Sequence, residues 1–435
     1  MTSDEAIAAE IADLSHDGRG VATIDGRRVF VVGALPTERV LIAPRRRRRR
    51  FQEAELVSVV DPAADRVAAP CEYFGRCGGC ALQHLAYPAQ VQFKQRVVAE
   101  AFARIGGLEP EEWLEPILGP QWRYRRRARL GVKYVEPKER VLVGFRERAA
   151  AYVTDMRHCL VLAAPADTAI EALADVIAAS SLKRQIPQVE VALGDAGGAL
   201  VVRVLADPHS GDLDLFRDFG RRFGLDVYLQ RGGPGTVAPI DGSPRALRYA
   251  LPDFDLELEF APTDFIQINA EINRKMVTAA IETAEIRRDD RVLDLYCGIG
   301  NFSLPLARRA REVFGVEGEA GLVARAARNA EKNGIANARF LAADLLQKDW
   351  SFFRERWDVV FIDPPRTGAE AAVADMARMA PRRIVYVSCH PATLARDAKI
   401  LVEAHGFRLR SARILDMFPH TYHVEAMAVF DRKDR

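Results

Sequence analysis

The feature that most constrains the fold is a regular alternation of buried strands, turns and helices in the last third of the chain. The strand-like runs are short and apolar, and they occupy Arg291–Leu295, Val313–Val316, Arg339–Leu341, Val359–Ile362 and Ile384–Ser388. Short apolar strands separated by helical stretches are typical of a parallel sheet covered by helices on both faces. We therefore predict a doubly wound, Rossmann-like α/β domain over residues 261–435.

A glycine turn and a series of acidic residues follow these strands. The turn Asp294-x3-Gly298-x-Gly300 lets the backbone approach a ligand closely. It differs from the nicotinamide fingerprint, and its acid would repel a pyrophosphate. Acids also end the next three strands, at Glu317, Asp344 and Asp363. A cationic ligand without phosphates fits this pattern, so we predict an S-adenosylmethionine site.

A thiol and a carboxylate are expected at the same sheet edge. Cys389 directly follows the strand Ile384–Ser388, at the edge where open α/β sheets bind ligands. The last strand, His423–Phe430, is predicted to run antiparallel, which returns Glu425 to that edge. Methylation of carbon 5 of uracil needs these two groups, because a thiolate adds at carbon 6 and a base then removes the proton on carbon 5. For a cysteine taken alone, burial as a small apolar residue is the alternative.

Four other cysteines have the spacing of metal ligands. The pattern Cys71-x5-Cys77-x2-Cys80, with the distant Cys159, supplies four thiolates. Zinc and an iron–sulfur cluster both accept such a set, and the spacing alone does not choose between them. The remaining cysteine, Cys297 in the glycine turn, is expected to pack in the core.

The first half of the chain predicts two further domains. Residues 1–64 alternate short strands with Gly, Asp and Pro, which favours a small β-barrel. Residues 65–260 mix strands and helices around the cysteines, and include a helix near 87–105. Two basic clusters, Arg45–Arg50 and Arg123–Arg129, suit a phosphate backbone, although a solvated surface explains either one equally well.

Composition places the chain among globular proteins. It has 49% hydrophobic and 28% charged residues, and a net charge of +2. Its apolar runs are shorter than the roughly 20 residues that span a bilayer. The first residues lack the pattern of a signal peptide, so we expect a cytoplasmic protein without a membrane partner.

Three motifs resemble those of the bacterial RNA uracil-5-methyltransferases, above all the 23S ribosomal RNA branch. Ser388–Asp397 resembles the family's nucleophile motif, and Phe418–Glu425 resembles the segment that holds its base. Phe265–Asn269 matches a segment whose Gln contacts the cofactor. The likeness covers nearly the whole chain. It departs at His390, where that branch usually has Asn, and at Pro365, where some members have Ala.

The resemblance implies a complete set of site residues. Cys389 would be the nucleophile and Glu425 the base. The cofactor contacts would be Gln267, Tyr296, Asn301, Glu317, Asp344 and Asp363, in addition to the glycines of the turn. Cys71, Cys77, Cys80 and Cys159 would hold a four-iron, four-sulfur cluster. The barrel would be a TRAM domain that binds RNA, the helix near 87–105 would pack on the methyltransferase domain, and the enzyme would act as a monomer on structured 23S ribosomal RNA.

Three alternatives accompany this interpretation. The first is a transfer RNA uridine methyltransferase, although enzymes of that kind usually lack the barrel and the cluster. The second is a radical methylthiotransferase, whose usual Cys-x3-Cys-x2-Cys spacing is absent here. The third is a non-catalytic RNA-binding protein. The combination of Cys389, Glu425 and an intact glycine turn argues against it.

Overall fold

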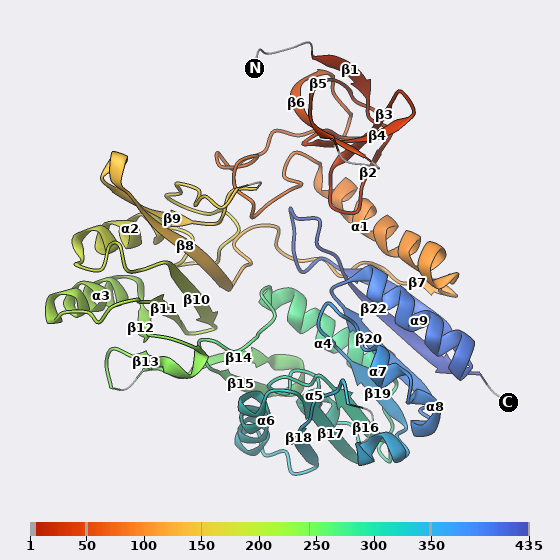
Figure 1. The fold of residues 1–435 in the computed structure, drawn as a ribbon. Coiled ribbons are helices and arrows are strands. Elements are labelled where there is room, and N and C mark those ends of the chain that lie inside the picture. Colours follow the sequence, from red (N-terminus) through yellow and green to blue (C-terminus); the bar gives the residue numbers. More distant parts are fainter. Residues whose placement is uncertain (1–5, 48–50, 149, 243, 348–349, 434–435) are drawn as a thin grey trace. The chain divides into compact units, whose positions relative to one another are not determined.

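The chain folds into two compact units, each assembled from separate segments. The computed structural model describes residues 6–47, 51–148, 150–242, 244–347 and 350–433 (Figure 1). Unit 1 comprises Met1–Val97, Phe145–Thr154 and Phe418–His423, and unit 2 comprises Val98–Gly144, Asp155–Met417 and Val424–Arg435. The chain therefore leaves unit 2 twice for a short excursion into unit 1. In the described ranges, no helix has both the length and the apolar character needed to cross a membrane.

Unit 1 is built around a six-stranded sheet. Its strands are β1 (Ile7–Glu10), β2 (Asp13–Leu14), β3 (Gly20–Ile24), β4 (Arg27–Val32), β5 (Arg39–Arg47) and β6 (Gln52–Asp61), in the order β1-β5-β6-β4-β3-β2. The strands β1 and β2 follow each other along the chain yet stand at opposite ends of this order. The sheet therefore curves around one core, to which Val31 and Ile42 contribute. Residues 48–50 of the first arginine cluster lie outside the described residues.

A helix and the cysteine segment complete unit 1. The helix α1 (Tyr87–Ala101) continues into a π-helical turn, η1 (Phe102–Gly106). Phe93 of α1 packs with Leu82 and Leu85 of the cysteine segment and with Leu35 of the sheet. The helix thus begins in unit 1, whereas its residues from Val98 onward belong to unit 2.

Unit 2 contains a mixed sheet in its first part. Its strands are β8 (Arg127–Val135), β9 (Arg140–Gly144), β10 (Gln188–Gly194), β11 (Gly197–Arg203), β12 (Leu225–Gln230) and β13 (Val237–Pro239), in the order β13-β12-β11-β10-β8-β9. Only β11 and β12 pair in parallel, because α3 (Ser210–Phe223) connects them. The helix α2 (Ile170–Ala179) packs beside α3 and against β9. A hairpin of β14 (Leu247–Leu251) and β15 (Leu256–Phe260) follows.

The second part of unit 2 is an eight-stranded, largely parallel sheet. Its strands are β16 (Arg291–Leu295), β17 (Glu312–Glu317), β18 (Ala338–Ala342), β19 (Val359–Ile362), β20 (Arg383–Ser388), β21 (Phe407–Leu415), β22 (Glu425–Arg432) and β7 (Glu112–Trp113), in the order β18-β17-β16-β19-β20-β22-β21-β7. The strands β16 to β20 are parallel, and β22 runs antiparallel to β20. The predicted doubly wound sheet and its antiparallel last strand are therefore confirmed. The order reverses beside β16, which is where such sheets form a ligand crevice.

Helices cover this sheet on both faces. They are α4 (Ala270–Ala284), α5 (Ser303–Ala307), α6 (Ala320–Lys332), α7 (Glu370–Val373), α8 (Met376–Met379) and α9 (Pro391–His405). The helix α9 lies against β20, β21 and β22 (Figure 1). Short 3-10 turns occupy Glu136–Lys138, Pro234–Thr236, Pro252–Phe254 and Ser351–Arg354.

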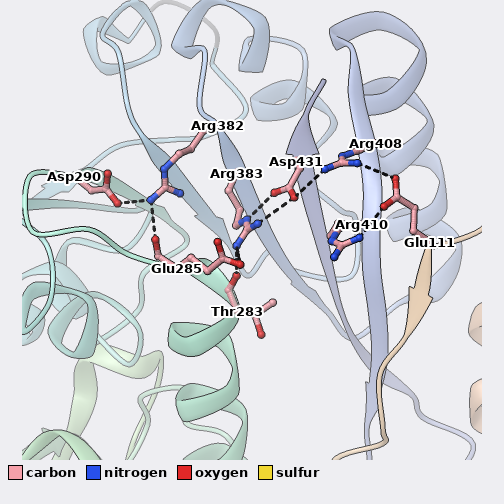
Figure 2. Close-up of polar contacts among 9 residues, drawn as sticks. All are labelled: Glu111, Thr283, Glu285, Asp290, Arg382, Arg383, Arg408, Arg410 and Asp431. Atoms are coloured by element: carbon pink, nitrogen blue, oxygen red, sulfur yellow. Dashed lines mark hydrogen bonds and ion pairs between the residues drawn. The ribbon is translucent and has the colours of Figure 1, made fainter. Parts of the chain in front are cut away.

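An arginine network fixes the register of β20 and β22 (Figure 2). Arg383 binds the carboxylate of Asp431 through Nε at 2.6 Å and through Nη2 at 3.0 Å, and the two residues are paired across the strands. The same register places Ser388 opposite Ala426 at the other end. A slip of one residue would turn every side chain of β22 to the other face. This ion pair therefore helps to fix which face Glu425 presents.

Candidate active site

Cys389 and Glu425 lie at the same edge of the eight-stranded sheet. Ser388 pairs with Ala426, so the residues just beyond this pair, Cys389 and Glu425, are also neighbours. Cys389 is half-buried. Burial raises the pKa of its thiol to about 11, and repulsion from Glu425 and then Asp363 adds to the rise. These interactions place the thiol beside two carboxyl groups, as the sequence predicts.

The Glu425 side chain can take up a proton in this position. It is 4% exposed, and burial raises the pKa of its carboxyl to about 7. Its Oε2 atom has no hydrogen-bond partner among the described residues. A carboxyl group that titrates near neutral pH and keeps an open oxygen is suited to general-base catalysis.

The loop after β19 borders Cys389 and is fastened to α9. It carries Asp363 and Arg366, and the positive charge of Arg366 partly offsets the rise in the pKa of Cys389. The hydroxyl of Thr393 donates to the carbonyl of Arg366 at 3.3 Å. Arg396 Nη2 donates to the carbonyl of Thr367 at 3.0 Å. Sequence reasoning missed Arg366, although its place three residues after Asp363 was a usable signal.

The glycine turn after β16 has the backbone conformation that its sequence requires. Gly298 and Gly300 have φ values of +56° and +95°, and Tyr296 adopts the left-handed region as well, at +64°. The amide of Gly298 donates to Glu317 Oε2 at 3.1 Å, and the amide of Glu319 donates to Oε1 of the same carboxylate at 3.1 Å. The turn therefore orients Glu317 at the end of β17.

Buried carboxyl groups concentrate negative charge beneath this turn. Burial raises the pKa of Asp294 to about 7, against a hydrogen bond from Ser303, and its Oδ1 has no hydrogen-bond partner among the described residues. Burial also raises the pKa of Asp363 well above its usual range, and repulsion from Glu425, Asp294 and Glu317 follows as a second cause. Such a set of acids favours a ligand that carries positive charge.

Asn301 and Gln267 differ in how firmly the protein holds them. Asn301 exchanges hydrogen bonds with Asn273 at 2.9 and 3.0 Å and accepts one from the Tyr249 hydroxyl at 2.9 Å. Its amide is therefore largely committed within the protein. Gln267 is half-buried between the buried residues Ile266 and Ile268. The Asn273 and Tyr249 contacts had no signal in the sequence.

The remaining predicted cofactor contact, Asp344, is exposed. It follows β18, and its Oδ1 accepts a hydrogen bond from the amide of Leu346 at 3.0 Å. It thus lies at the end of the third strand of the series, beside the turn that leaves the sheet.

The second arginine cluster divides into inward and outward residues. Arg126 contacts Asp195, and Arg127 donates to the carbonyls of Thr263 at 2.7 Å and of Asp264. Both side chains are 20% exposed. Arg127 therefore braces the segment that leads to Gln267, a role that the sequence did not indicate.

Arg123 and Arg129 are the outward residues of this cluster. Their side chains are 71% and 67% exposed, and each also forms an ion pair with an acid of the protein, Asp167 and Glu190. Within residues 123–129, these two remain candidates for contact with a phosphate backbone.

The predicted cluster cysteines fall in both units. Cys71, Cys77 and Cys80 belong to unit 1 and Cys159 belongs to unit 2. The amide of Gly79 donates to Cys77 Sγ at 3.4 Å, a contact that suits a thiolate ligand. Among the described residues, however, no three His, Cys, Asp or Glu side chains are grouped so that they could hold a metal ion. The residue types fit an iron–sulfur cluster, but the ligands are not assembled.

The sixth cysteine has a packing role. Cys297 is buried, and a Cβ atom placed on Gly315 of β17 would lie 2.9 Å from its Sγ. The thiol therefore fills the space that the glycine leaves open, as expected from the sequence.

Comparison with known proteins identifies relatives along the whole chain. The sequence model of the family described as tRNA (Uracil-5-)-methyltransferase matches residues 248–433. The chain is 48% identical to the 23S rRNA (uracil(1939)-C(5))-methyltransferase RlmD of Stenotrophomonas maltophilia (strain R551-3), over 98% of this chain and 97% of that protein. It is 50% identical to the enzyme of the same name from Alkalilimnicola ehrlichii, over 97% of this chain and 96% of that protein.

A solved structure shares the fold. The tRNA (uracil-54, C5)-methyltransferase of Pyrococcus abyssi, in complex with S-adenosyl-L-homocysteine, aligns with a TM-score of 0.75 and 24% identity, over 98% of this chain and 100% of that one. The full-length identity to the curated relatives is high enough to decide the family. The chain belongs to the RNA uracil-5-methyltransferases, in the branch of the 23S ribosomal RNA enzymes.

Proposed function

We propose that this protein methylates carbon 5 of a uridine in 23S ribosomal RNA, with S-adenosylmethionine as the methyl donor. The observation that carries the proposal is the pairing of the Cys389 thiol with the Glu425 carboxyl at the ligand-binding edge of a doubly wound sheet. An enzyme that methylates an exocyclic amine needs neither group. The curated relatives, which are named as enzymes of this reaction, support the same substrate.

The chemistry follows from these two residues. The Cys389 thiolate bonds to carbon 6 of the uracil, and the resulting enolate makes carbon 5 a nucleophile. S-adenosylmethionine, when bound, supplies an electrophilic methyl group. Glu425 then removes the proton from carbon 5, the bond between Sγ and carbon 6 breaks, and the double bond between carbons 5 and 6 is restored.

The acids of the crevice are proposed to hold the cofactor. Glu317 is oriented by the glycine turn, and Asp363 lies beside Cys389, where its charge would face a sulfonium group. Gln267, Tyr296, Asn301 and Asp344, with the backbone of Gly298 and Gly300, complete the proposed set of contacts.

The substrate can be tested directly. Purified protein is given radiolabelled cofactor and either protein-free 23S ribosomal RNA or transfer RNA. Label at carbon 5 of a uridine in the ribosomal RNA supports the proposal. Label in transfer RNA alone favours the transfer RNA enzyme, a methylthio product favours the radical enzyme, and the absence of label in any RNA favours a binding protein.

We also propose that Cys71, Cys77, Cys80 and Cys159 hold a four-iron, four-sulfur cluster. Four thiolates and the Gly79 amide directed at Cys77 are the supporting features. Anaerobically purified protein should be brown, with about four irons per chain, and Cys77→Ser should bleach it. Colourless protein with one zinc per chain would exclude the cluster.

The organisation around this activity is proposed as follows. Residues 1–64 form a TRAM domain that binds the RNA, residues 65–260 carry the cluster, and residues 261–435 perform the methyl transfer. The curved six-stranded sheet of β1 to β6 supports the first assignment. The enzyme is proposed to act as a cytoplasmic monomer, where ribosomal RNA is modified.

A further inference from the structure

The loop that immediately precedes Glu425 is held by unit 1. The strands β21 and β22 form an antiparallel hairpin whose last pair is Leu415 and Glu425. Between these two residues the chain passes into unit 1, to which Phe418–His423 belongs. Glu425 is therefore the first paired residue after a loop. A strand end beside a loop frays unless the loop itself is ordered.

Buried side chains of α1 order this loop. Gln90 Oε1 accepts a hydrogen bond from the amide of His420 at 3.0 Å, and Gln90 Nε2 lies 3.3 Å from His420 Nδ1. Lys94 Nζ donates to the carbonyl of Phe418 at 2.8 Å. Gln90 and Lys94 are each 1% exposed. One helix face thus binds the loop at two points, two residues apart.

The cysteine segment binds the same loop from another side. The amides of Ala81 and Leu82 both donate to the carbonyl of His420, at 2.8 and 2.9 Å. These amides directly follow Cys80 in the sequence. His420 itself has a φ of +64°, a conformation that a residue with a Cβ adopts only when its surroundings impose it. Five contacts on two residues, Phe418 and His420, supply that constraint.

Burial of Lys94 is costly for a purely structural contact. Removal of an ammonium group from water costs several kcal/mol, and an apolar side chain of similar size would usually fill such a site at least as well. A buried Lys that binds a loop carbonyl is better explained by a need for one loop conformation than by stability. The residue that depends most directly on that conformation is Glu425, two positions after the loop.

We propose that Gln90 and Lys94 are positioning residues for Glu425, and that they act through the loop Phe418–His423. The inference rests on the function proposed above. Glu425 acts only after methyl transfer, when the carbon 5 proton is removed. Loss of the loop contacts should therefore slow the release of the covalent intermediate and spare the steps that form it.

Two RNA substrates separate these steps. In RNA with 5-fluorouridine, carbon 5 carries fluorine instead of a proton, so attack by Cys389 and methyl transfer give an adduct that no base can resolve. Formation of this adduct reports the early steps alone. With ordinary RNA, the amount of methylated adduct during turnover reports the release step. Gln90→Ala and Lys94→Met are compared with wild type, and Gln92→Ala, an exposed residue of the same helix, is the matched control.

The expected result is a separation of the two readouts. Gln90→Ala should form the fluorouridine adduct at the wild-type rate, accumulate methylated adduct on ordinary RNA and lose about tenfold in kcat, a fraction of what a general base contributes. Gln92→Ala should behave as wild type. The positioning role is wrong if Gln90→Ala turns over normally without adduct, or if both readouts fall together with the folded fraction measured by circular dichroism. Absence of the fluorouridine adduct in wild type would overturn the proposed function itself, and the positioning role with it.

Discussion

The hydroxyl of Tyr386 donates a hydrogen bond of 2.6 Å to the carboxylate of Asp397, and both side chains are fully buried. Tyr386 lies on β20, three residues before Cys389, and Asp397 lies on α9. The same carboxylate accepts a hydrogen bond from the amide of Ala369 at 2.7 Å and contacts Arg396 at 2.7 Å. One buried carboxylate therefore connects the strand before the nucleophile to the loop that carries Asp363 and Arg366.

This connection predicts a graded loss of stability. Tyr386→Phe removes one hydrogen bond to a charged group and should cost about 1.5–3 kcal/mol. Asp397→Ala leaves the buried Tyr386 hydroxyl and the Ala369 amide without their acceptor, so it should cost more, about 3–5 kcal/mol. Urea denaturation measures both values, and Tyr152→Phe, at a residue 73% exposed, is the control. Equal effects of Tyr386→Phe and Tyr152→Phe would contradict this account.

The roles of Cys389 and Glu425 predict two different failures. Cys389→Ala should abolish methylation and form no adduct while it still binds cofactor and RNA, because the thiol is needed to form the covalent bond. Glu425→Gln should transfer the methyl group and then accumulate a methylated protein–RNA adduct, because proton removal is slowed. A denaturing gel with labelled cofactor distinguishes the two. Turnover by Cys389→Ala would disprove the mechanism.

The raised pKa of Cys389 predicts how its reactivity changes with pH. Below a thiol's pKa, the thiolate fraction rises tenfold for each pH unit. Because the pKa is about 11, alkylation of Cys389 by iodoacetamide should quicken about 100-fold from pH 7 to pH 9. S-adenosylmethionine should accelerate alkylation more than S-adenosylhomocysteine does, because its positive charge offsets the repulsion from Glu425 and Asp363. Peptide mapping against Cys389→Ala assigns the modified site, and a pH-independent rate would refute the prediction.

The raised pKa of Glu425 predicts a pH-dependent cost to stability. The pKa is about 7 in the folded protein and 4.5 for an ordinary Glu, so the folded state holds the proton more tightly. Stability should therefore fall as pH rises from 4.5 to 7, by up to about 3 kcal/mol. Glu425→Gln removes this cost, so it should equal wild type near pH 4 and exceed it at pH 8 in thermal unfolding. The control is Glu331→Gln, at an exposed position, which should track wild type at both pH values.

The division of the second arginine cluster predicts two classes of variant. Arg123→Gln with Arg129→Gln should flatten the salt dependence of RNA binding by roughly 0.7–0.9 per lost phosphate contact, because these side chains are exposed. Arg127→Gln should leave that slope unchanged and weaken cofactor binding, because its hydrogen bonds brace the segment before Gln267. Filter binding over a salt series and calorimetry with the cofactor check the pair. The same slope change for both variants would refute the division.

The sequence by itself determined the doubly wound sheet and the identity of the reacting groups. Strand periodicity, glycine turns and strand-end acids are local signals, and the carboxyl ends of parallel strands necessarily meet at one edge. This is why Cys389 and Glu425 could be brought together before the structure was known. Element boundaries were close, with β22 at Glu425–Arg432 where His423–Phe430 was expected.

Only the tertiary structure decided which polar residues turn inward. Arg126 and Arg127 read as surface charges because their acceptors lie far along the chain, at Asp195 and Thr263. The excursion of Phe418–His423 into unit 1 likewise depends on Gln90, more than 300 residues away in the sequence. A buried polar group must find a partner wherever the fold supplies one. Local pattern records that such a residue is polar, but long-range packing determines what it holds in place.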